Sequence, residues 1–297
     1  MKLFFFQFII CLFFLSPSWA SGDILVVQSF PIKPYNDALN GFRSVCKARI
    51  NKLVGPDLSE AEIMGKVRRN RPDLILAIGM DALNKLKTVK DVPIVYVMVL
   101  NPRELIRDGG NITGVSMNLA PERQFSMLRE VLPHVRKIAI FFDPDKSGFY
   151  ISRVHNAASL MGIDLVTKKV ENSREAVAAV DTLKGKVDAL WLLPDTTVVN
   201  PSTIDLLLLS SIANKIPVIT FSEKYAEKGA LLSLEVDAAE SGKQAGEMAV
   251  KILGGAKVNS IKGEDARESI LTVNLIVAKK LGISISANVI KHARVIR

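Results

Sequence analysis

Polar side chains that could hold a small ligand follow the apolar, strand-like runs of the first half of the sequence. Ser29 and Asn101 each come shortly after such a run. Gly79 permits a sharp turn into a helix whose first N–H groups could bind a carboxylate. In the alternative, Asp81 caps that helix itself, and its charge would repel an anion. These candidates offer a ligand mostly hydrogen-bond donors.

Carboxylates occupy the comparable positions of the second half. Asp195 follows an apolar run and could pair with a ligand ammonium, a pair that the exclusion of water would strengthen. The alternative is a turn or capping role after Pro194. Asp237 either contacts the ligand or begins the helix that follows it. A zwitterion with its carboxylate toward the first half and its ammonium toward the second matches this asymmetry.

Two aromatic residues, Tyr35 and Phe221, could flank an apolar ligand side chain, although isolated aromatic residues are more often packing residues. Trp191 lies within a strand-like run and is expected in the core. The sequence has no nucleophile elbow, phosphate loop, dinucleotide fingerprint or zinc-helix motif. We therefore expect a binding protein rather than an enzyme, without a metal or cofactor.

The composition fits a soluble globular protein, with 48% hydrophobic and 23% charged residues. The net charge of +9 suggests nucleic acid as a partner, but the basic residues are dispersed. No aromatic residues accompany the cluster at 66–71 or the basic tail at 291–297. Solvated helix surfaces explain this pattern better than a nucleic-acid interface.

The first 20 residues are typical of a secretory signal peptide. Lys2 precedes the apolar run 3–15, and Ser18-Trp19-Ala20 forms a small-x-small cleavage pattern. About 13 apolar residues are too few to cross a bilayer, which needs roughly 20. We expect a periplasmic or otherwise exported protein that begins at Ser21. Cys46 is then its one cysteine, which excludes an internal disulfide.

Short β-branched runs alternate with amphipathic helices along the rest of the chain, and the pattern restarts near residue 115. This alternation predicts an α/β fold with two doubly wound, Rossmann-like lobes, whose ligands bind at the carboxyl ends of the strands. Strands are predicted at 23–28, 49–54, 73–78, 93–98, 137–142, 164–169, 189–193, 217–220 and 230–234, and helices at 59–69, 81–87, 121–132, 152–161, 173–183, 201–212 and 241–253.

An ordered set of short motifs runs along the chain. The motifs are Pro-Tyr-x-x-Ala-Leu-x-Gly-Phe at 34–42, Leu-Ala-Ile-Gly-x-Asp-Ala-Leu at 76–83, Pro-Ile-Val-Tyr at 93–96, Asn-Ile-Thr-Gly-Val-Ser at 111–116, Phe-Asp-Pro at 142–144, Ser-Gly at 241–242, Val-Asn at 273–274 and Ala-Lys-Lys-Leu-Gly at 278–282. Each motif is weak alone, but the set covers nearly the whole mature chain in order. The set resembles the periplasmic substrate-binding proteins of ABC transporters, in the group related to tryptophan and aromatic amino-acid binding proteins.

The resemblance implies a type I periplasmic binding protein, with three hinge crossovers near 113–116, 235–237 and 268–270. The implied lobes are 21–114 plus 237–268 and 115–236 plus 269–297. A monomer would capture a small polar ligand, such as an amino acid, for ABC permease subunits. A periplasmic sensor subunit and a secreted enzyme on the same fold are the alternatives.

The sequence departs from its relatives in two places. The segment before Asp73 is short, so we expect one strand of the first lobe to be abbreviated. Met80 stands where relatives often carry a hydroxyl, which leaves the ligand class open. The candidate ligand contacts are Ser29, Tyr35, Met80, Asp81, Asn101, Asp143, Asp195, Thr196, Phe221, Ser222 and Asp237.

Overall fold

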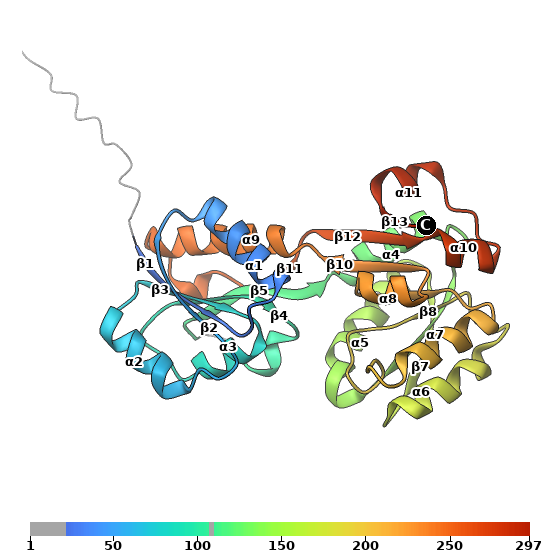
Figure 1. Cartoon of the computed structure of the whole chain (residues 1–297), viewed down its shortest axis with the longest axis horizontal. Coiled ribbons are helices and arrows are strands. Elements are labelled where there is room, and N and C mark those ends of the chain that lie inside the picture. Colours follow the sequence, from blue (N-terminus) through green and yellow to red (C-terminus); the bar gives the residue numbers. More distant parts are fainter. Residues whose placement is uncertain (1–21, 107–109) are drawn as a thin grey trace, which may run out of the picture.

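The computed structural model describes residues 22–106 and 110–297, which form two α/β lobes (Figure 1). The predicted signal peptide at 1–20 and the predicted start at Ser21 lie outside the described residues. The part described contains no helix that is both long and apolar enough to cross a membrane.

The first lobe contains a six-stranded sheet in the order β11-β5-β4-β3-β1-β2. All its strand pairs are parallel. The expectation of an abbreviated strand is wrong, because all six residues of β2 pair with the six of β1. The strands are β1 (Asp23–Gln28), β2 (Arg49–Val54), β3 (Leu74–Ile78), β4 (Ile94–Val99), β5 (Ile112–Leu119) and β11 (Glu264–Ala266).

The second lobe contains a seven-stranded sheet in the order β13-β12-β10-β9-β8-β6-β7. Its pairs are parallel except for β12, which runs antiparallel to β10. The strands are β6 (Lys137–Phe142), β7 (Asp164–Lys169), β8 (Ala189–Trp191), β9 (Val218–Thr220), β10 (Leu232–Val236), β12 (Ser269–Asn274) and β13 (Arg294–Ile296).

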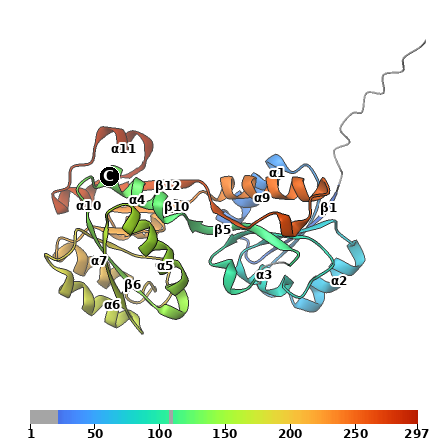
Figure 2. The ribbon, with the colours of Figure 1, turned by 180° about the vertical axis from the view of Figure 1, so that it is seen from behind.

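The chain crosses between the two sheets three times, after β5, after β10 and between β11 and β12. Figures 1 and 2 show these connections running together between the lobes. The predicted fold class, two doubly wound lobes joined by three crossovers, is therefore confirmed. The lobe boundaries at 114/115, 236/237 and 268/269 stay a proposal.

Helices cover both faces of each sheet because successive strand residues face opposite sides. In β1, Ile24 and Val26 belong to the core on the α1 and α9 side, whereas Leu25 and Val27 pack with residues of α2 and α3. The helices are α1 (Lys33–Val45), α2 (Glu60–Asn70), α3 (Met80–Leu86), α4 (Pro121–Val131), α5 (Pro144–Leu160), α6 (Ser173–Val180), α7 (Ile204–Ala213), α8 (Glu223–Lys228), α9 (Ala238–Leu253), α10 (Leu275–Leu281) and α11 (Ala287–His292).

Helices α1 and α9 approach each other closely in the first lobe. A Cβ atom added to Gly242 would lie 1.9 Å from the Ala38 carbonyl oxygen, and one added to Gly41 would lie 1.9 Å from that of Ala239. Only residues without a side chain fit at these two points. The contact anchors α9, which enters the first lobe directly from the second crossover.

Where an element is predicted, the structure differs mainly in where the helices begin. The helix expected at 152–161 starts at Pro144, because Asp143 accepts a hydrogen bond from the Asp145 N–H as its N-cap. The predicted core position of Trp191 is confirmed. Trp191 is buried and packs edge-on against Phe125, with ring centroids 5.2 Å apart.

Candidate ligand-binding site

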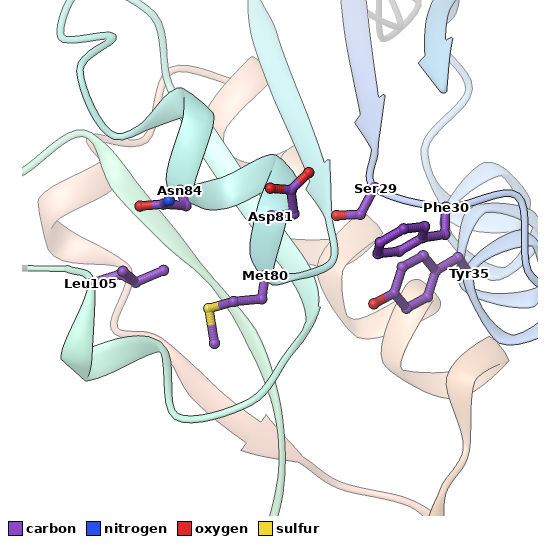
Figure 3. Close-up of a pocket in the computed structure, with 7 residues that line it drawn as sticks. All are labelled: Ser29, Phe30, Tyr35, Met80, Asp81, Asn84 and Leu105. Carbon is purple, nitrogen blue, oxygen red and sulfur yellow. The ribbon is translucent and has the colours of Figure 1, made fainter. Parts of the chain in front are cut away.

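A pocket of about 360 Å³ lies at the carboxyl ends of β1 and β3 in the first lobe (Figure 3). Strand β5 leaves the same edge of this parallel sheet for the second lobe, so the pocket lies on the side of the first lobe that faces the second. Seven first-lobe residues line it: Ser29, Phe30, Tyr35, Met80, Asp81, Asn84 and Leu105.

The turn after β3 is built around Gly79, whose φ of +94° is a conformation that favours glycine. A Cβ atom there would lie 2.7 Å from both the Ser29 hydroxyl and the Tyr35 ring. The Ser29 hydroxyl accepts from the Ala82 N–H at 2.9 Å and donates to the Ile78 carbonyl at 3.1 Å. Ser29 therefore joins β1 to the start of α3, which leaves its hydroxyl no proton for a ligand.

The start of α3 tests one of the two alternatives given for it above, a capping role for Asp81. The N-cap is Gly79, and no side chain caps the helix there. The Asp81 carboxylate instead pairs with the Lys85 ammonium 2.9 Å away, one turn along the helix. The capping role considered for Asp81 is thus wrong, and its charge at the pocket is partly balanced by Lys85.

The other walls of the pocket are largely apolar and aromatic. Phe30 is 42% exposed although it is a large hydrophobic residue. Burial, and then the charge of Asp81, raises the pKa of the Tyr35 phenol, so Tyr35 stays neutral at physiological pH. Met80 lines the pocket beside Leu105. Such walls suit a flat apolar group better than a sugar, which needs many polar partners.

Side chains from the two lobes meet beside α5. The Asn101 amide, following β4, donates to the Lys146 carbonyl at 3.3 Å. Its own buried oxygen has no hydrogen-bond partner among the described residues. The Arg103 guanidinium lies 5.4 Å from the centroid of the Phe149 ring. Asn101 thus contacts the opposite lobe and lies outside the lining of the first-lobe pocket.

The structure argues against the proposed ammonium partner in the second lobe. Asp195 is 1% exposed, and its carboxylate accepts from the Ser147 hydroxyl at 2.7 Å and from backbone N–H groups of Asp143, Thr197 and Val198 at 2.8, 2.9 and 3.3 Å. These donors occupy both carboxylate oxygens, so neither is available to a ligand ammonium. The turn role, left open above, is the one the structure shows.

Asp143 and Asp237 serve the backbone in a similar way. Asp143 caps α5, and its hydrogen bonds from the Thr197 hydroxyl and the Asp145 N–H hold its pKa below its usual value. Asp237 caps α9 by accepting from the Glu240 N–H at 3.0 Å. Both residues therefore have capping roles, which fit the helix-starting alternative for Asp237.

The remaining candidates of the second lobe lie apart from the pocket. Thr196 is exposed on the loop after β8. Ser222 is the N-cap residue of α8, with no capping bond from its side chain. Phe221 packs edge-on against Tyr225 at 5.4 Å. Tyr35 and Phe221 are thus on different lobes and do not flank one pocket in this structure.

Sequence reasoning missed two kinds of residue. Phe30, Asn84 and Leu105 line the pocket from positions outside the motifs quoted above. Glu235, near the end of β10, is half-buried, and desolvation raises the pKa of its carboxyl above the usual range. The alternating polar residues Ser233 and Glu235 in an otherwise apolar strand were the available signal.

A pocket at the carboxyl edge of one α/β lobe, facing a second lobe across three crossovers, defines a two-lobed binding protein. The chain belongs to the ABC transporter substrate-binding proteins, because the family model described as "ABC transporter substrate binding protein" matches residues 54–296. Members of this family are binding proteins that work outside the cytoplasmic membrane with permease partners.

Individual relatives agree with this assignment. The chain is 29% identical over 244 residues to a tyrosine-binding protein of Clostridioides difficile, covering 78% of this chain and 70% of that protein. Its fold matches the ligand-free, open structure of a substrate-binding protein with adhesive properties from Clostridium difficile, with a TM-score of 0.77, 23% identity and coverage of 93% and 99%. It also matches an L-Trp complex of an ABC domain from Streptococcus pneumonia, with a TM-score of 0.64, 24% identity and coverage of 93% and 100%.

Proposed function

We propose that this protein is an exported monomer that captures an aromatic amino acid between its lobes and delivers it to an ABC importer. The observation that carries the proposal is the first-lobe pocket, where Phe30, Tyr35, Met80 and Leu105 surround a space of about 360 Å³. This apolar and aromatic lining fits a ring. The names of a tyrosine-binding relative and of an L-Trp complex of the same fold support the same ligand class.

A thermal-shift screen of the twenty amino acids tests the ligand class. The protein is first stripped of bound ligand by unfolding and refolding. L-Tyrosine or L-tryptophan should raise the melting temperature, because a ligand that binds only the folded protein stabilises it. At a ligand concentration of 100 times the Kd, the free energy of unfolding increases by roughly 2.7 kcal/mol. Lysine and glutamate serve as controls, because their charged side chains do not suit the apolar lining. No shift with either aromatic amino acid would refute the proposal.

Small-angle scattering tests the capture between lobes. Ligand that bridges the two lobes should reduce the radius of gyration, whereas ligand held by the first lobe alone would leave it unchanged. Scattering at zero angle also gives the molecular mass, and a mass of two chains would contradict the monomer. Mass spectrometry of the exported protein should find Ser21 at its N-terminus, and retained Lys2 would contradict cleavage.

A further inference from the structure

Glu235 lies at the edge of the second sheet that faces the first lobe. It is the penultimate residue of β10, and the chain leaves that end of β10 for α9, which packs on α1 in the first lobe (Figure 1). The first-lobe pocket lies at the opposing carboxyl edge. Topology therefore places Glu235 and the pocket on the two sides that approach each other when the lobes close.

The Glu235 carboxylate lacks the partners that the other acids of this edge possess. It accepts one hydrogen bond, a long one of 3.4 Å, from the Glu223 N–H. No ion pair among the described residues includes Glu235, because the nearby Arg294 guanidinium pairs with the Glu223 carboxylate at 2.9 Å. Burial disfavours an unpaired charge, and it raises the pKa of this carboxyl.

The sheet surface beside Glu235 also carries polar groups that lack hydrogen-bond partners among the described residues. Ser233 shares its face of β10, since the two residues are two positions apart. Thr220 and Thr272 are the direct cross-strand neighbours of Ser233. All three hydroxyls are buried, and none has a hydrogen-bond partner within residues 22–106 and 110–297. A polar strip with unused hydrogen-bonding capacity therefore continues from Glu235 into the second lobe.

We propose that Glu235 is the second-lobe residue that pairs with the ligand ammonium and so selects an amino acid over its deaminated counterpart. This inference rests on the proposed function and replaces Asp195 in that role. An ammonium supplies the positive charge and the donors that the Glu235 carboxylate lacks. The pair forms on lobe closure, when water leaves the site and the attraction strengthens.

Isothermal calorimetry with matched ligands tests the pair. The probes are L-tyrosine and 3-(4-hydroxyphenyl)propanoate, which differ only in the ammonium group, with L-tryptophan and 3-(indol-3-yl)propanoate as a second pair. Glu235→Gln should weaken binding of the amino acid by roughly 30-fold, the lower end for breaking a desolvated charge pair. It should change binding of the deaminated acid by less than about threefold.

Glu227→Gln is the matched control, because it removes the same charge from an exposed position of α8. It should leave all affinities unchanged. Equal losses for amino acid and deaminated acid in Glu235→Gln would overturn the inference, because a structural role affects both. Unchanged amino-acid affinity in Glu235→Gln would overturn it as well. If the wild type binds neither L-tyrosine nor L-tryptophan, the proposed function fails first and the inference fails with it.

Discussion

Replacing Asp195 with asparagine tests whether this carboxylate serves the fold or the ligand. Its two oxygens accept four hydrogen bonds, two from Asp143 and Ser147 at the start of α5 and two from its own loop after β8. Asparagine keeps one acceptor oxygen and turns the other into an NH₂ donor. Two of the donors, the Asp143 N–H and the Ser147 hydroxyl, share one oxygen and would then face a donor.

The expected cost follows from these partners. A buried donor left without an acceptor costs about 1–3 kcal/mol. The Ser147 hydroxyl can rotate toward another acceptor, whereas the Asp143 N–H is fixed by the backbone. We expect Asp195→Asn to lower the free energy of unfolding by about 2–4 kcal/mol. At roughly 2–4 °C per kcal/mol for a unit of this size, the melting temperature falls by about 5–15 °C.

The assay pairs thermal unfolding, followed by circular dichroism, with calorimetry of ligand binding below the transition. Asp205→Asn is the control, because its carboxylate pairs with Lys228 at an exposed site and its loss should cost less than about 1 kcal/mol. Ligand affinity of Asp195→Asn should stay within about threefold of the wild type. An unchanged melting temperature together with a large loss of affinity would refute the structural role and restore Asp195 as a ligand contact.

Three further changes follow from the same geometry. Gly242→Ala should lower the free energy of unfolding by more than about 3 kcal/mol in urea titrations, because its Cβ would lie 1.9 Å from the Ala38 carbonyl oxygen. A smaller decrease in the free energy of unfolding would mean that α1 and α9 can separate freely. Gly79→Ala should weaken ligand binding by at least about tenfold in calorimetry, because the alanine is strained at φ +94° and its Cβ would lie 2.7 Å from the Ser29 hydroxyl. Full affinity would show that this turn does not shape the pocket. Burial raises the pKa of Glu235 above 4.5, so amino-acid affinity should fall as the pH drops from 7 through that pKa, because a protonated carboxyl does not attract an ammonium. An affinity that falls only at the pH where an ordinary glutamate is protonated would contradict this prediction.

The sequence predicts β1, β3 and β4 of the first sheet because these strands are buried on both faces. Strands such as Leu74–Ile78 appear as unbroken apolar runs bounded by turn residues. The expected alternation with helices also yields the two-lobed fold. The last 35 residues are different: β11, β13 and α11 are only three to six residues long, and such short elements leave no periodic pattern.

Candidate site residues are harder to predict than the elements that carry them. The loops after β1 and β3 lie at the pocket, as the topology of parallel sheets requires. Some side chains in these loops hold the turn together, and others line the pocket. Ser29 is occupied by hydrogen bonds that bind the turn together, whereas its neighbour Phe30 lines the pocket and is exposed. The type of a residue does not reveal which of these two tasks it performs.

Asp195 and Glu235 show why this division escapes sequence reasoning. Both acids lie near the carboxyl end of an apolar strand of the second sheet, so both appear equally able to bind an ammonium. The donors that occupy Asp195 include two groups that precede it by 48 and 52 residues, a proximity that exists only in the folded lobe. In the part of the chain that the structure describes, the Glu235 carboxylate receives one long hydrogen bond, from the backbone of α8. An incoming cation gains most where a carboxylate is partly desolvated and its oxygens are still free, and among these two acids that condition is met by Glu235.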